Sequence, residues 1–185
     1  MKKNKFLLVC LVSILALTSC KKKKDDYTKF VENVNNSISE VTYVESNYDI
    51  TDSNVEVYRA KKSISKITNE NDQFSGEVST EEYKLNSSFK LEKNNKVENF
   101  SGISKSILFA YNLDKDTFTK YDFTTDGFEA TVSKDNISKF FNVNDLVVDD
   151  DIVVKIALTD NKITLFETSY KQGTKTITIK VAYTY

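Results

Sequence analysis

The chain has 185 residues and a formal net charge of −1, and it contains no His, no Trp and no Pro. Without imidazole the sequence has no Ser-His-Asp or Cys-His catalytic system and no His-ligated zinc site. The two Cys are too few for a thiolate cluster. Tyr and Phe together number 22, which is enough to build a hydrophobic core, so the composition predicts a folded domain.

The start of the chain has the layout of a signal peptide. Lysines at positions 2, 3 and 5 form a basic start, and residues 6–17 form an apolar run of 12 residues. A helix needs about 20 apolar residues to cross the hydrocarbon core of a bilayer, so this run is too short to span it. A basic start before a short apolar run is typical of a secretory signal peptide, which we assign to residues 1–19.

The apolar run ends in Leu17-Thr18-Ser19-Cys20, which resembles the lipobox of bacterial lipoproteins. The resemblance implies cleavage between Ser19 and Cys20 and a diacylglyceryl group on the Cys20 thiol. The alternative is an ordinary secretory signal peptide followed by a chance Cys. Because two acyl chains anchor a protein stably and one does not, we expect an extracytoplasmic protein that is lipid-anchored to the bacterial cell membrane.

Charge is distributed unevenly behind Cys20. Residues 20–26 form a basic tether that contains Lys21 to Lys24, whereas residues 27–185 carry 19 basic and 25 acidic residues, a net charge of −6. The four lysines either contact anionic headgroups or form a solvated spacer. No basic patch follows the tether, so we do not expect a nucleic-acid partner. Arg59 is the only arginine, which is typical of low-GC bacteria and leaves the envelope type and membrane leaflet open.

Two segments have helical periodicity. Apolar residues recur every three or four positions over 27–41, which predicts a helix with Asp26 as its N-cap. A second, short helix is expected over 135–142, capped by Asp135. Runs rich in Val, Ile, Thr, Tyr and Phe predict strands at 43–50, 55–67, 76–85, 87–93, 106–113, 117–123, 127–133, 150–159, 162–170 and 175–185.

The last three strands permit a prediction of register. Asp160-Asn161 suits a two-residue hairpin turn, and residues 171–173 suit a three-residue loop with its Gly in the left-handed region. This register places Leu165 in the middle of one buried face and Thr164 on the other, with Glu167 at the rim of the buried face or in a cavity. The predicted buried face comprises Ile156, Leu158, Ile163, Leu165, Ile177, Ile179 and Val181.

These elements predict an α+β fold for residues 27–185 as a single domain: a curved antiparallel β-sheet, an incomplete barrel of about nine or ten strands, with an N-terminal helix and one short internal helix. The order of elements resembles the LolA/LolB-like lipoprotein fold. That resemblance implies that lipids or lipoproteins are carried in the concavity between sheet and helices. No site residue of that family transfers by position, so the ligand-binding residues stay unknown.

The sequence marks no catalytic site. No two of the acidic residues stand out as a glycosidase pair, and no metal site or cofactor is expected, so we predict a protein that is not an enzyme. The densest acidic cluster, Asp149 to Asp151, is either a solvated loop or a weak site for a hard cation.

Two functions therefore remain. The favoured one is a surface or protein-interaction module with a dry core. The alternative is a carrier or binder of a lipid or other apolar ligand in a slot lined by Phe89, Phe109, Phe118, Phe123, Phe128, Phe140 and Phe141.

Overall fold

The computed structural model describes residues 25–185; the predicted signal peptide, Cys20 and Lys21 to Lys24 lie outside the described residues. Two α-helices and nine strands occur in the described part, and three short 3₁₀ turns lie between them. In chain order the elements are α2 (Asp26–Ile38), β1 (Tyr43–Asp52), β2 (Val55–Glu70), β3 (Gln73–Leu85), β4 (Leu91–Ile103), β5 (Phe118–Thr124), β6 (Gly127–Val132), α3 (Ile137–Phe141), β7 (Ile152–Thr159), β8 (Lys162–Gln172) and β9 (Lys175–Thr184).

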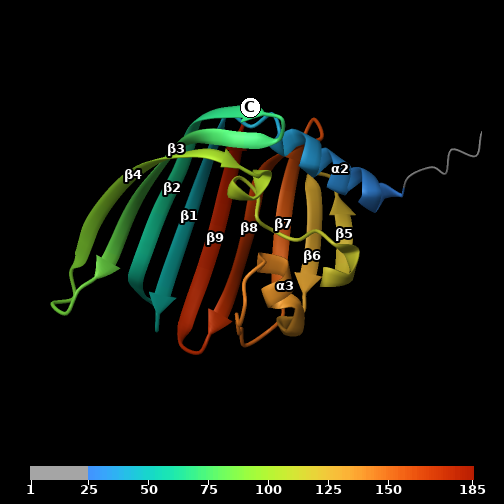
Figure 1. The fold of residues 1–185 in the computed structure, drawn as a ribbon. Helices are drawn as coiled ribbons and strands as arrows, with labels where there is room; N and C mark the ends of the chain where they lie inside the picture. The colour runs from blue at the N-terminus through green and yellow to red at the C-terminus, as the bar shows by residue number, and fades with distance from the viewer. Residues whose placement is uncertain (1–24) are drawn as a thin grey trace, which may run out of the picture.

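All nine strands belong to one antiparallel sheet with the order β4-β3-β2-β1-β9-β8-β7-β6-β5. The first and last strands of the chain pair in the middle, so β4 and β5 form the two edges and the sheet does not close into a barrel (Figure 1). The predicted antiparallel sheet with an N-terminal helix and a short internal helix is confirmed. The fold is mostly β, with less helix than the term α+β suggests.

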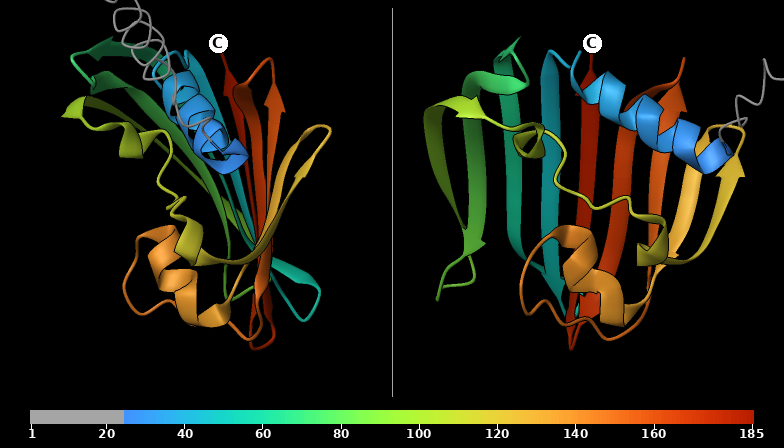
Figure 2. Two further views of the ribbon diagram at one scale, coloured as in Figure 1. Left: turned by 90° about the vertical axis from the view of Figure 1, so that its right-hand side faces the viewer. Right: turned by 45° about the vertical axis from the view of Figure 1, so that its right-hand side comes forward.

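Both helices and the segment between β4 and β5 lie on one side of the sheet, and β2 to β4 curl toward that same side (Figure 2). We call this the concave face and the other the convex face. Helix α2 packs on β8 and runs toward β5, so it covers the half of the sheet formed by β5 to β9. Among the described residues, no helix covers β2, β3 or β4.

Helix α2 forms for the predicted reason, because its apolar positions share one face. Tyr27, Phe30, Val34 and Ile38 are all buried against the sheet. The predicted cap is off by one residue: the Asp25 carboxylate, not that of Asp26, accepts the hydrogen bond from the Thr28 amide at 2.7 Å. The helix also ends at Ile38 instead of residue 41.

The short internal helix is smaller than predicted. A 3₁₀ turn over Lys134–Asn136 precedes α3, and Asp135 lies in that turn without capping the helix. Asn142 ends the helix in the left-handed conformation, with φ of 52°. Ile137 and Phe140 are buried, so the helix packs on the core through one apolar face.

Two strand predictions are wrong. Residues 106–113 form a 3₁₀ turn and an irregular segment that crosses the concave face (Figure 2). The apolar residues of this segment cover the sheet and do not form a strand within it: Leu108 is buried and Phe109 packs on the core. The strand predicted at 87–93 begins later and is longer: β4 covers Leu91–Ile103.

The predicted register of the last strands is also wrong beyond the first turn. Asp160 and Asn161 do form the expected hairpin turn, with φ of 52° and 63°. A register shift between Ala157 and Leu158 then adds one residue to β8, and the next turn has two residues, since Gln172 pairs with Lys175. The extra residue exchanges the two faces of β8 from Leu165 onward. The shorter turn exchanges them again, so β9 keeps its predicted buried face.

As a result, Phe166 occupies the buried position predicted for Leu165. Phe166 pairs with Ile156 and Val181 and is fully buried, whereas Leu165 lies half-buried on the convex face. Glu167 shares that convex face and lies between Lys155 and Lys180 on the neighbouring strands, not in a cavity.

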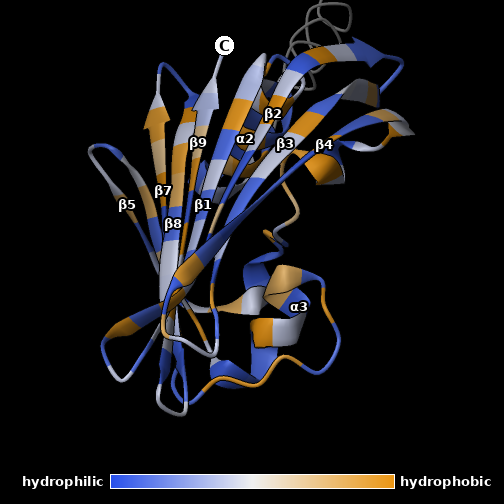
Figure 3. Cartoon of the chain, turned by 90° about the vertical axis from the view of Figure 1, so that its left-hand side faces the viewer, coloured by the Kyte–Doolittle hydropathy of each residue, from blue (hydrophilic) through white to orange (hydrophobic). Residues whose placement is uncertain are grey.

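Most of the hydrophobic core lies between β5 to β9, α2, α3 and the crossing segment, and it extends to Val44 of β1, Ile64 of β2 and Phe74 of β3. Figure 3 shows hydrophobic residues along β7 and on α3. Aromatic rings join these layers: Phe30 of α2 stacks on Phe128 of β6 with ring centroids 4.3 Å apart. The sheet, both helices and their shared core all lie within residues 25–185, so we expect this segment to fold on its own.

Candidate ligand groove

The uncovered half of the concave face contains a cavity of about 700 Å³, which we call the outer groove. It lies over β1, β2, β3, β4 and β9. Its apolar and aromatic lining includes Tyr48, Tyr58, Val78, Phe100, Ile179 and Val181. Five of these six side chains are only partly buried, although Tyr48, Val78, Phe100 and Ile179 pack against the edge of the core; Val181 is buried.

A second cavity of about 500 Å³, the inner groove, lies beneath the crossing segment and α3. Besides tyrosine hydroxyls, its polar lining consists of Ser46, Lys62 and Ser106. Lys62 is the only charged residue among the described residues that line it. The apolar lining includes Leu108, Phe141, Val143, Leu146, Val181 and Tyr183.

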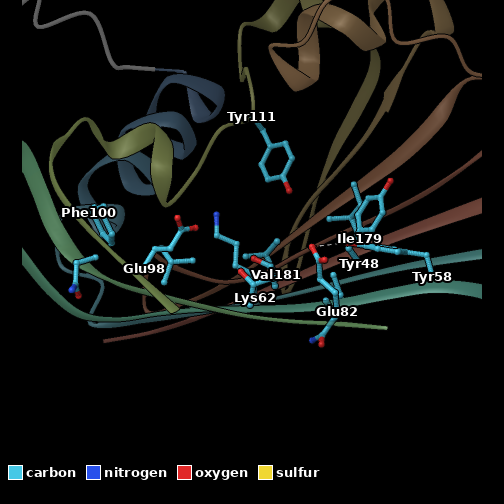
Figure 4. Close-up of a pocket in the computed structure, with 15 residues that line it drawn as sticks. Tyr48, Tyr58, Lys62, Glu82, Glu98, Phe100, Tyr111, Ile179 and Val181 are labelled. Atoms are coloured by element: carbon cyan, nitrogen blue, oxygen red, sulfur yellow. Dashed lines mark hydrogen bonds between the residues drawn. The ribbon is translucent and has the colours of Figure 1, made fainter. Parts of the chain in front are cut away.

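The two cavities share four residues: Ser46, Lys62, Tyr111 and Val181. Strand pairing explains three of them, because Ser46 of β1 lies opposite Lys62 on β2 and opposite Val181 on β9. Tyr111 comes from the crossing segment, and its hydroxyl points down toward the strands while the Lys62 amine points up from β2 (Figure 4). We call this point the junction of the groove.

The polar groups at the junction have no partner. Among the described residues, neither the Ser46 hydroxyl, the Lys62 ammonium nor the Tyr111 hydroxyl makes a side-chain hydrogen bond or an ion pair. By contrast, both acids of the outer groove are engaged: Glu82 accepts a hydrogen bond from the Tyr58 hydroxyl at 3.2 Å, and Glu98 pairs with Lys96 at 2.8 Å.

Tyr111 is held firmly although it belongs to an irregular segment. Its ring stacks on Phe166 with centroids 3.7 Å apart and an angle of 12°, and on Phe140 at 5.5 Å. Burial raises the pKa of the Tyr111 hydroxyl above its ordinary value, so at neutral pH the group is a neutral hydrogen-bond donor.

The convex face of the same strands has a different character. Lys61 pairs with Glu45 at 2.9 Å, Lys93 pairs with Glu81, and the guanidinium of Arg59 lies 4.6 Å from the centre of the Tyr83 ring. The Lys61 hydrogen bond is the main cause that lowers the pKa of Glu45. Charges on the convex face thus neutralise one another locally.

The predicted phenylalanine slot is mostly wrong. Phe118, Phe128 and Phe140 are buried core residues, and Phe89 is 83% exposed in the turn between β3 and β4. Phe141 alone of the seven lines the inner groove, and none of them lines the outer groove. The remaining members, Phe109 and Phe123, line two smaller surface depressions.

Sequence reasoning missed Lys62 and Tyr111. The available signal was the alternation in β2, in which Tyr58, Ala60, Lys62 and Ile64 share one face. A lysine within a row of apolar residues is costly to bury without a partner, which marks the position as unusual. Tyr111 carried no such signal, because its role depends on the path of the crossing segment.

The acidic cluster contributes hydrogen bonds to neighbouring backbone. An Asp149 carboxylate oxygen accepts from the Gly173 amide at 2.8 Å, and Asp151 accepts from the Lys134 amide at 3.0 Å. Within residues 25–185, no group of three or more acidic side chains is arranged to hold a metal ion.

Comparisons with known proteins do not assign a family. No protein-family model matches the chain, and no curated protein matches it significantly. A solved structure of full-length peroxisomal multifunctional enzyme type 2 from Drosophila melanogaster aligns with 89% of this chain at 9% identity, with a TM-score of 0.24. The chain spans 42% of that structure, and a likeness at this TM-score carries no argument about fold or function. None of the helices in the described segment is both long and apolar enough to cross a membrane.

Proposed function

We propose that this protein is a non-catalytic extracytoplasmic lipoprotein, anchored through acylated Cys20 and the lysines at 21–24, whose concave groove binds an apolar ligand. The observation that carries the proposal is the pair of adjoining cavities, of about 700 and 500 Å³, on the concave face beside the half of the sheet that α2 covers. Both volumes lie in the range of small-molecule sites.

The lining of the groove supports a ligand more than a dry core. Tyr48, Phe100 and Ile179 remain partly exposed on the concave face, although a domain of this size gains stability by burying such residues. A concave, mostly apolar surface with a few placed polar groups is the usual form of a ligand site. An open, curved sheet with helices over its concave face is also what the resemblance to LolA/LolB-like lipoproteins implies.

A second candidate, the surface or protein-interaction module, is favoured by the β4 edge. This strand has 13 residues and an unpaired edge, with Leu91, Val97 and Ile103 at 38%, 62% and 39% exposure. An exposed edge with unpaired backbone groups can accept an additional strand from a partner protein.

The groove proposal is tested with N-phenylnaphthylamine, a neutral dye whose fluorescence rises in apolar sites. Residues 25–185 should bind it saturably. Ser46→Trp places an indole at the junction and should abolish this binding, whereas Ser169→Trp, the same change at an exposed convex position of β8, should leave it unchanged. No saturable binding by the unmodified domain, or equal binding by both variants, would refute the groove as a ligand site.

A further inference from the structure

We infer that the groove selects a single-chain amphiphile with a carboxylate head, a fatty acid, whose head pairs with Lys62 at the junction while its chain lies in the inner groove. This inference rests on the proposed function, and it adds the chemical class of the ligand and the residue that selects it.

The charge of the junction favours an anion. The Lys62 side chain is partly buried between Ala60 and Ile64 of β2, and its ammonium has no carboxylate partner among the described residues. A cation held in such a place without a partner costs free energy, which an anionic ligand would offset. The Ser46 and Tyr111 hydroxyls supply two further free donors beside it.

The charge and the number of donor groups at the junction favour a carboxylate over a phosphate monoester. One ammonium matches the single charge of a carboxylate, whereas a phosphate monoester carries up to two charges and would leave one of them unpaired. Three donor groups, the Lys62 ammonium and the hydroxyls of Tyr111 and Ser46, suffice for the two oxygens of the carboxylate.

The linings of the two cavities set the direction of the chain. The inner groove has no acidic residue among its described members, and Leu108, Val143 and Leu146 offer an aliphatic surface. The outer groove contains Glu82 and Glu98, which would repel a carboxylate. The head therefore lies at the junction, on the side of the inner groove.

The test uses displacement of N-phenylnaphthylamine from residues 25–185 by palmitate and by cetyl alcohol, which has the same chain length and a neutral head. Palmitate should compete on the order of tenfold better, as expected for one charge-assisted interaction in a partly desolvated site. Lys62→Met keeps the length of the side chain and should remove this preference, without changing displacement by cetyl alcohol. Lys62→Arg should retain it.

Lys180→Met is the matched control. Lys180 lies on the convex face between the groove residues Ile179 and Val181, so the change removes the same charge without touching the groove. It should leave the preference for palmitate intact. Tyr111→Phe keeps the ring stacking and removes one hydrogen-bond donor, so it should weaken the binding of palmitate only a few-fold.

The outcomes separate the two proposals. If the dye binds and both competitors displace it equally, or if Lys62→Met retains the preference for palmitate, the carboxylate inference is wrong and the apolar groove stands. If the dye does not bind at all, the proposed function fails, and the inference fails with it.

Discussion

The ring of Tyr111 stacks on Phe166, with centroids 3.7 Å apart and an angle of 12° between the ring planes. This contact fixes the crossing segment over strand β8. It also sets the height of the Tyr111 hydroxyl above Lys62, so the shape of the junction depends on a core residue of the sheet. Changes to Phe166 should therefore affect both stability and ligand binding.

The first prediction tests the register of β8. Phe166→Ala should lower the free energy of unfolding by about 3–5 kcal/mol, because it removes a fully buried ring and the stacking contact of that ring with Tyr111. Leu165→Ala, at the half-buried convex position, should cost about 1 kcal/mol. Urea denaturation of both variants measures the difference, and a larger loss at Leu165 would mean that the register is shifted by one residue.

Local sequence patterns are enough to predict some elements of this fold. Helix α2 follows from its apolar spacing, and the Asp160-Asn161 turn follows from residue types that tolerate positive φ. The face of Leu165 did not follow, since a single extra residue at the bulge beside Ala157 reverses the alternation, and nothing in the local sequence marks it.

The site shows the same limit. The alternation along β2 puts Lys62 on the same face as Ala60 and Ile64. Whether Lys62 lies at a cavity depends on the path of the crossing segment. That segment, residues 106–113, has the composition of a strand and lies instead across the sheet. A run of apolar residues indicates burial. It does not show whether the run is a strand within the sheet or a segment that packs on top of the sheet.

The second prediction concerns alkaline pH. Burial and, after it, the neighbouring Tyr48 raise the pKa of Tyr170 from 10.0 to about 12. The unfolded chain loses this proton first, so the stability contributed by the neutral hydroxyl is complete below pH 10 and is lost as the pH rises from 10 to 12.

Urea denaturation across this range measures the effect. Tyr170→Phe should show a shallower loss of stability with rising pH than the unmodified domain, because one of the groups responsible is gone. Identical pH profiles for the two proteins would contradict a buried, protonated Tyr170.

The third prediction concerns two glycines at turns. A Cβ at Gly127 would overlap the carbonyl oxygen of Ile156 on β7, so Gly127→Ala should destabilise the domain by about 3 kcal/mol. Gly173 has φ of 60° and open space around it, so Gly173→Ala should cost only about 1 kcal/mol, for the left-handed backbone. Thermal unfolding that ranked the two variants in the reverse order would contradict the close approach of β6 to β7.

The fourth prediction concerns the proposed anchor. Cys20→Ser removes the thiol that would take the diacylglyceryl group, so the full chain expressed in a bacterium should lose both acylation and cleavage before residue 20. Labelling with radioactive palmitate and the apparent mass of the product measure both. Incorporation of label into the Ser variant would show that Cys20 is not the site of acylation.

Native mass spectrometry of residues 25–185, after incubation with a total lipid extract of bacterial membranes, tests the central claim most directly. The groove account predicts a one-to-one complex with an added mass in the range of a fatty acid. This adduct should persist in Ser169→Trp and be absent from Ser46→Trp. A bare domain under these conditions, or an adduct of equal abundance on all three proteins, would contradict a ligand site in the concave groove.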